Sequence, residues 1–179
     1  MFMSLVRARR SQRTFVPDTP LTTEQKETLL EAALRAPSSR SLNPWEFIAI
    51  DDPSLLEKLS YAKPHGASFL KLAPFGIVVI ADPDRCDVWV EDCAIAAIFI
   101  QMAAEELGLG SCWIQVRKRM HDETITSEAY IRELLKIPEN RVVAFMIAVG
   151  IPNKKQPPHP NASLLWEKIH YGVYGGRSV

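Results

Sequence analysis

Two uninterrupted apolar runs constrain the fold of this chain more than any other feature of its sequence. Residues 75–81 read FGIVVIA, and residues 142–149 read VVAFMIAV. A strand with one face in solvent alternates apolar and polar side chains, whereas a strand covered on both faces is apolar throughout. Both segments are therefore predicted to be strands with other elements packed on each side.

The most apolar segment, residues 89–107, has helical spacing. We interpret it as a central helix that is apolar nearly all round and therefore buried, in part by a second subunit. A membrane span is excluded, because the apolar run from Cys93 is interrupted at Gln101 and ends at Glu105, well short of the ~20 residues that a span requires. Gly108 is expected to end the helix.

Shorter signals divide the rest of the chain. Thr22, with Gln25 three residues later, has the pattern of a helix N-cap, and Pro37 stops the helix that follows. Asp52 followed by Pro53 marks the start of another short helix. The other predictions are a strand at 45–50, a strand within 108–116, a helix at 127–136, an unassigned segment at 61–72, and an irregular aromatic arm at 153–179 that packs on another surface.

Gly108 and Gly110 form a Gly-x-Gly that invites comparison with dinucleotide-binding loops. That motif follows a strand, precedes a helix and carries a third glycine. Here a helix comes first and a strand follows, so a dinucleotide-binding loop is excluded.

Composition limits the class of protein. The 179 residues, 47% of them hydrophobic, fit a single domain, 1–179. Lys+Arg 21 balances Asp+Glu 21, which argues against a nucleic-acid-binding domain. The three cysteines have neither disulfide nor metal spacing, so we expect a cytoplasmic protein. We see no targeting segment at the N-terminus and expect no membrane association.

Two polar segments are candidates for binding. Residues 6–15 hold four arginines with no acidic side chain before Asp18. Several guanidinium groups in one short stretch suit a phosphate or another planar anion, although a solvated charge run has the same pattern. Residues 36–47 place three serines and Asn43 between two prolines, which fixes the directions of their polar groups; the alternative is an ordinary polar turn.

In their order along the chain, these motifs resemble the FMN-dependent nitroreductase family. The matching pieces are RRSQRTF at 9–15, the loop at 36–47, the central helix running into GLGSCWI at 108–114, and IPE at 137–139 leading to a strand that ends in GIP at 150–152. The resemblance implies an α+β fold: a three-layer α/β/α sandwich with a mostly antiparallel sheet, in an intertwined homodimer with two FMN sites at the subunit interface. The C-terminal arm would then reach over the partner.

The resemblance also implies a role for each matching residue. The first arginine and the serine of the N-terminal motif hold the phosphate and ribityl end of the flavin, and the later arginine lies near N1 and O2, where a cation stabilises the charge of a reduced flavin. The polar loop contacts the flavin bound mainly by the other subunit, and a strand lines one ring face with a backbone N–H near N5. These cofactor-binding residues are Arg9, Arg10, Ser11 and Arg13; Pro37, Ser38, Ser39, Ser41 and Asn43; and Trp113, Ile114 and Gln115.

The chain departs from the family pattern at several positions. Ser41 stands where asparagine is frequent and Asn43 where glutamine is usual, so the loop reaches less far. Val116 replaces a common glycine. Many members carry a lysine or arginine for the phosphate in the tail, where this chain has Asn161-Ala162-Ser163. Lys154, Lys155 and His159 have no assigned role there.

The function implied is that of an NAD(P)H-dependent flavin oxidoreductase. NADH or NADPH delivers hydride to N5 and leaves, and a nitroaromatic or quinone takes its place, so the kinetics are ping-pong with no dedicated nucleophile or general base. One alternative is a flavin-binding protein without efficient turnover; another, from the arginines alone, is an anion- or nucleic-acid-binding module.

Other candidate groups for chemistry are weaker. The four histidines are scattered, lack metal-ligand spacing and are interpreted as surface residues, with His65 the partial exception because relatives place flavin contacts in that region. Cys112 is interpreted as a small core residue rather than a nucleophile.

Overall fold

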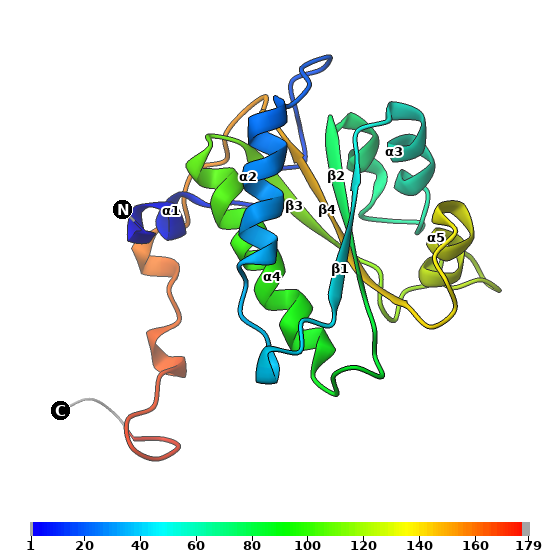
Figure 1. Cartoon of the computed structure of the whole chain (residues 1–179). Helices are drawn as coiled ribbons and strands as arrows, with labels where there is room; N and C mark the ends of the chain where they lie inside the picture. Colours follow the sequence, from blue (N-terminus) through cyan, green and yellow to red (C-terminus); the bar gives the residue numbers. More distant parts are fainter. Residues whose placement is uncertain (1, 177–179) are drawn as a thin grey trace.

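A four-stranded antiparallel sheet in the order β1-β2-β4-β3 lies at the centre of the fold (Figure 1). Its strands are β1 (Trp45–Ile50), β2 (Phe75–Ala81), β3 (Gly110–Gln115) and β4 (Val142–Gly150). The structure, a computed structural model, describes residues 2–176. The two apolar runs form the central strands β2 and β4, and every residue of β2 is buried. The prediction that these strands are covered on both faces is confirmed.

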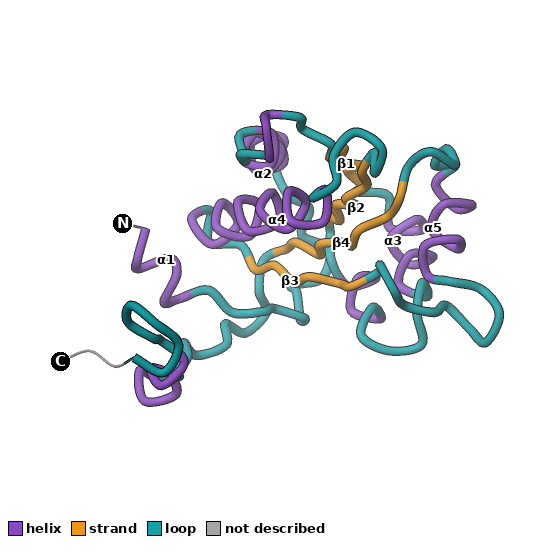
Figure 2. The backbone as a smooth tube through the Cα atoms, turned by 90° about the horizontal axis from the view of Figure 1, so that it is seen from below, coloured by secondary structure: helices purple, strands orange, loops and turns teal. Residues whose placement is uncertain are grey.

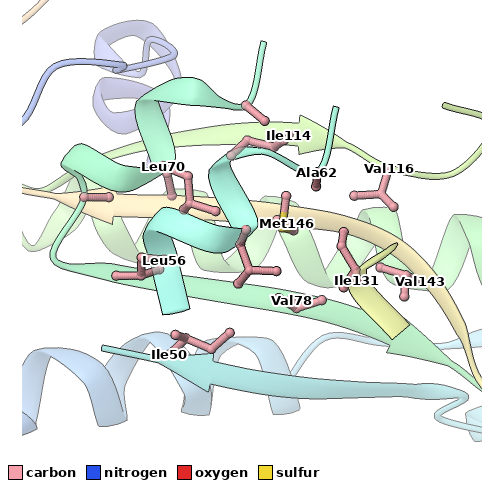
Figure 3. Close-up of a cluster of buried hydrophobic side chains, with 14 of the residues drawn as sticks. Ile50, Leu56, Ala62, Leu70, Val78, Ile114, Val116, Ile131, Val143 and Met146 are labelled. Carbon is pink, nitrogen blue, oxygen red and sulfur yellow. The ribbon is translucent and has the colours of Figure 1, made fainter. Parts of the chain in front are cut away.

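Helices cover both faces of the sheet, which gives three layers (Figures 1 and 2). On one face, α2 and α4 pack over a core that includes Ile77, Phe145 and Ile147. On the other face, α3, α5 and the 3₁₀ turn η2 enclose the core drawn in Figure 3, where Leu56, Leu70 and Ile131 point toward the sheet. The helices are α1 (Phe2–Ala8), α2 (Thr23–Leu34), α3 (Pro53–Ser60), α4 (Trp89–Glu106) and α5 (Ser127–Leu135), with 3₁₀ turns η1 (Ser39–Ser41), η2 (Ser68–Leu72), η3 (Asn161–Ser163) and η4 (Trp166–Lys168). The predicted α/β/α sandwich with an antiparallel sheet is confirmed.

The predicted helix boundaries rest on hydrogen bonds that the structure contains. The Thr22 hydroxyl accepts from the Gln25 N–H at 3.1 Å, and the Gln25 side chain accepts from the Thr22 N–H at 2.9 Å, which completes a capping box for α2. The Asp52 carboxylate caps α3 by accepting from the Ser54 N–H at 2.8 Å. Gly108, with φ of 72°, ends α4 in the left-handed region that glycine adopts without strain.

The central helix α4 is buried on one face only. Ala96, Ile100 and Ala104 are fully buried against the sheet and α2. On the opposite face Ile98 is 47% exposed and Phe99 38% exposed. The sequence predicts a helix buried in part by a second subunit, and in one chain this apolar face stays exposed.

The two ends of the chain differ most from the sequence-based expectations. The sequence patterns do not predict α1, which spans seven residues and contributes no buried side chain. The arm beyond Asn153 projects away from the sheet, and its residues are exposed as far as Gly175. It carries large exposed apolar side chains, including Leu165, Trp166 and Tyr174. Within residues 2–176, no helix has both the length and the apolar content needed to cross a membrane.

Candidate functional site

The segment that carries the arginines is aligned along the open edge of the sheet. β3 is the last strand of the sheet, and Ser11 forms a parallel bridge with Ser111 on its outer side. The N–H of Gln12 donates to the Ser111 carbonyl at 3.0 Å. A Cβ on Gly110 would lie 2.7 Å from the Gln12 side chain. The second glycine of the Gly-x-Gly therefore leaves room for the Gln12 side chain where the two segments pair.

Three cations and one hydroxyl influence the buried thiol of Cys112. Burial raises the pKa of this thiol, while Arg13, the Ser11 hydroxyl, Arg9 and Lys63 oppose that rise. Within residues 2–176, none of the three cations forms an ion pair with an acidic side chain. We call Arg9, Ser11, Arg13 and Lys63 the basic edge. Cys112 itself is 1% exposed, so its interpretation as a core residue is confirmed.

Lys63 is the member of the basic edge that the sequence patterns do not predict. It lies in the unassigned segment 61–72, which forms turns followed by η2. Burial, followed by the charge of Arg119, lowers the pKa of Lys63. The guanidinium of Arg13 lies 5.8 Å from the centre of the Phe69 ring in η2. The turns after α3 thus supply the cation Lys63, and η2 supplies the aromatic ring of Phe69, to this edge.

The open edge of β3 also presents backbone donors. Because the carbonyl of Ser111 faces outward and residues of an antiparallel strand alternate in direction, the N–H groups of Trp113 and Gln115 face the same edge. The N–H of Ile114 faces β4, and its side chain is fully buried in the core. Two of the three strand residues therefore offer a backbone N–H to a ligand at this edge.

Two polar side chains of β3, those of Trp113 and Gln115, form hydrogen bonds within the protein. The Trp113 indole N–H donates to Gln115 Oε1 at 2.9 Å, and Gln115 Nε2 donates to the Arg117 carbonyl at 2.9 Å. The Trp113 ring stacks on Phe145 with 3.5 Å between centroids. These contacts fix the strand rather than reach for a ligand.

The polar loop at residues 37–43 is strained. Arg40 and Ser41 each have φ of 53° and Asn43 has φ of 46°, although none of them is glycine. Left-handed backbone at a non-glycine residue costs about 1 kcal/mol or more, and such strain persists only where surrounding contacts enforce it. The Ser38 hydroxyl donates to Asn43 Oδ1 at 2.6 Å and accepts from the Asn43 N–H at 2.9 Å, so both side chains close the loop on itself.

The loop is attached to the start of α4. The N–H of Ser39 donates to Asp92 Oδ1 at 2.8 Å, and Arg40 forms an ion pair with Asp87. Asp92 lies in the first turn of α4 and is 2% exposed. Ser41 and Pro37 are exposed, and Ser39 is half-buried.

Within one chain, the 37–43 loop and the basic edge are attached at different places. The loop meets the beginning of α4, whereas the basic edge meets β3 just beyond its end. α4 has 18 residues and is about 27 Å long, so it separates Ser11 from Ser39. β3 runs back along this helix, and the Arg117 guanidinium just beyond β3 lies 5.6 Å from the centre of the Trp89 ring at the start of α4. Figure 1 shows the loop at the foot of α4.

Arg10 points to the arm instead of joining the basic edge. Its guanidinium donates to the carbonyl of Pro157. Lys155 lies 3.9 Å from Glu105 at the end of α4. Both contacts hold the base of the arm, and the residues beyond it stay exposed.

The histidines do not form a metal site. Within residues 2–176, no group of three or more metal-ligating side chains is arranged to hold an ion. His65, His159 and His170 are exposed as expected. His121 differs, because Nδ1 lies 2.9 Å from the Tyr61 carbonyl and its ring stacks on Tyr130. It has a structural role in the segment between β3 and α5.

Three comparisons with known proteins converge. The family model described as "Nitroreductase family" matches residues 6–63 and 60–151. An Archaeoglobus fulgidus protein, provisionally named a NADH dehydrogenase/NAD(P)H nitroreductase, is 38% identical over 86% of this chain and 87% of its own length. A Vibrio harveyi NADPH-flavin oxidoreductase is 29% identical over 86% of this chain and 66% of its own length. The solved structure of an FMN-dependent nitroreductase from Clostridium difficile R20291 superposes with a TM-score of 0.93 and 44% identity, covering 96% of this chain and 99% of that one.

Proposed function

Since this chain belongs to the nitroreductase family and is an FMN-dependent NAD(P)H oxidoreductase, we propose its specific reaction. Electrons from NADH or NADPH pass to electron-poor acceptors such as nitroaromatics and quinones in a ping-pong cycle. The chain acts as a single domain in a homodimer, in the cytoplasm, where the nicotinamide pool is available.

One observation carries the proposal: the segment that bears Arg9 and Arg13 pairs with the open edge of β3, and within residues 2–176 neither these arginines nor Lys63 forms an ion pair with an acidic side chain. Cations without a counter-ion at a surface fit a ligand that brings its own negative charge. FMN carries a phosphate dianion at one end and a polar aromatic ring system at the other. The donors of the basic edge and the outward N–H groups of β3 therefore fit this cofactor.

We assign the roles as follows. Arg9 and Ser11 hold the phosphate and ribityl end, and Arg13 lies beside N1 and O2 of the ring, with Lys63 as a further cation. The backbone of Trp113, Ile114 or Gln115 faces the ring near N5; the outward direction of the Trp113 and Gln115 N–H groups favours those two. Arg10 holds the arm at Pro157, next to the phosphate end.

The partner subunit completes each site. We propose that the loop residues Pro37, Ser38, Ser39, Ser41 and Asn43 contact the flavin held by the other subunit's basic edge. In support, Ser39 is held at the start of α4, whereas Ser11 pairs with β3 just beyond the end of that helix. The exposed apolar face of α4 packs against the partner, and the arm at 153–179, as far as it lies within the described residues, lays its apolar side chains on the partner.

When bound, FMN supplies the hydride chemistry, taking two electrons from the nicotinamide and passing them to the acceptor. The protein residues do the rest by position and charge. Arg13 stabilises negative charge at N1 and O2, the N–H groups of β3 orient the ring, and the subunit interface excludes water from one ring face. No side chain acts as a nucleophile or general base.

Absorption and anaerobic reduction test the proposal. The purified protein should be yellow or should bind added FMN, and mixing it anaerobically with NADH or NADPH should bleach the oxidised flavin band. Adding a nitroaromatic or a quinone should restore that band with one two-electron turnover per flavin. A flavin that stays oxidised with both nicotinamides would indicate a flavin-binding protein without turnover. A protein that binds no FMN would sink the flavin assignment altogether.

A further inference from the structure

Asp92 is a buried carboxylate that neither the family motifs nor the proposed chemistry uses. It is 2% exposed in the first turn of α4, where the helix dipole favours a negative charge. Oδ1 accepts from the Ser39 N–H at 2.8 Å, and Oδ2 accepts from the Cys86 thiol at 3.3 Å. Both carboxylate oxygens therefore have partners, and one of these is the backbone of the polar loop.

The place at which Asp92 holds the loop is mechanically important. Ser38 and Asn43 close the loop from within, but the left-handed residues Arg40 and Ser41 lie between them. Ser39 directly precedes this left-handed pair. Because Asp92 fixes the Ser39 N–H, it sets the direction of the backbone just before the left-handed residues Arg40 and Ser41. The ion pair between Arg40 and Asp87 holds the exposed side of the loop.

The surroundings of Asp92 keep the contact rigid. Cys86 is 2% exposed and Cys93 is fully buried. Burial, followed by the charge of Asp92, raises the pKa of Cys93 to about 12. Cys93 therefore stays neutral beside the carboxylate. A buried acceptor without access to water is expensive to leave unpaired, so the Ser39 N–H is held strongly.

We propose that Asp92 is a positioning residue for the flavin site: through the Ser39 N–H it fixes the 37–43 loop in the strained form that meets the partner's cofactor. This rests on the proposed function, in which the loop serves the flavin of the other subunit. Asp92 touches neither cofactor nor substrate, and it acts across the subunit interface.

Substitutions at Asp92 separate this role from simple packing. Asp92→Ala removes the acceptor and should weaken FMN binding by about tenfold or more, measured by flavin fluorescence on titration of the apoprotein. Asp92→Asn keeps an oxygen for the Ser39 N–H and should recover most of the affinity. Glu91→Gln, at an exposed position in the same helical turn, is the matched control and should bind FMN as the wild type does. Equal losses in Asp92→Asn and Asp92→Ala would overturn the proposal.

A mixed dimer gives the sharper readout. Asp92→Ala subunits are co-expressed with Arg9→Ala subunits under two affinity tags, and the mixed dimer is purified. One site then combines an intact basic edge with an intact loop, so it should bind one FMN per dimer with wild-type affinity. A role of Asp92 within its own subunit's site would leave no intact site. If Asp92→Ala does not fold, Ser39→Pro, which removes the N–H that donates to Oδ1, is compared with Ser39→Ala, which keeps it. Equal FMN affinities of these two homodimers would overturn the proposal. A mixed dimer without a tight site overturns this inference alone, whereas a wild type that binds no FMN overturns the proposed function too.

Discussion

The basic edge and the 37–43 loop are built in opposite ways, although we propose that both hold the same cofactor. The basic edge lies on a regular strand and relies on charge, with three cations that no acidic side chain within residues 2–176 neutralises. The loop brings serine and asparagine groups into place on a backbone with three left-handed residues. Charge acts over a distance and tolerates small displacements, whereas neutral hydrogen bonds depend on geometry. The two regions should therefore respond differently to substitution.

The largest effect is expected from a change that leaves both regions folded but keeps them apart. Ile98 is 47% exposed on the outer face of α4, and Ile98→Glu places a charge where we propose that the partner packs. The variant should be a folded monomer by sedimentation and should lose FMN binding almost completely. Leu72→Glu, at a position 53% exposed on the other side of the sheet, serves as the control. A monomer that still binds FMN tightly would show that one chain completes the site.

Within the basic edge, we expect Arg9 to determine how tightly FMN is bound and Arg13 to determine the reduction potential of the flavin. Arg9→Ala should raise the FMN dissociation constant by about a hundredfold and reduce the dependence of binding on salt, because it removes a charged contact to the phosphate. Arg13→Ala should mainly lower the reduction potential of the flavin, by about 30 mV for each tenfold loss of preference for the reduced form. Arg7→Ala, in exposed α1, is the control for both. Equal effects of the two substitutions on retention and on potential would contradict this division.

Lys63 should have a smaller effect on FMN binding. Lys63→Met keeps the apolar stem that packs in the protein and removes the charge, so the FMN dissociation constant should rise about tenfold. Lys58→Met, at an exposed position on α3, should leave it unchanged. Indistinguishable affinities of the Lys63→Met and wild-type proteins would remove Lys63 from the basic edge.

The sequence predicts the parts of this fold that depend on local pattern. The strands β2 and β4, the capping box at Thr22 and the end of α4 at Gly108 follow from periodicity and backbone chemistry within a few residues. The family resemblance correctly implies the three-layer sandwich. The arginine motif and the loop are also found from sequence, because their residue types are unusual for their position.

The remainder depends on contacts between distant segments. Lys63 reaches the basic edge only through the packing of η2 and β3, and a single lysine between two helices carries no signal of that. Asp92 looks like an ordinary acidic residue in the first turn of a helix, and its bond to Ser39 joins residues 53 positions apart. The one-sided burial of α4 is likewise hidden, because the helix is apolar on both faces.

The smallest expected effect tests whether the strain of the loop serves binding. Ser41 and Lys136 have similar left-handed backbones, with φ of 53° and 55°, but Lys136 ends α5 away from the loop. Glycine at either position relieves up to about 1 kcal/mol of strain, so each apoprotein should melt about 2–4 °C higher by calorimetry. Ser41→Gly should also bind FMN a few times more weakly, because a relaxed loop no longer holds its polar groups in one direction, whereas Lys136→Gly should not.

Ser41→Ala removes the same hydroxyl but keeps the strain, so the difference between Ser41→Gly and Ser41→Ala isolates the contribution of geometry. If Ser41→Gly and Ser41→Ala bind FMN equally well, Ser41 contributes through its hydroxyl alone. The loop and the basic edge would then differ only in that one uses neutral hydrogen bonds and the other charged ones.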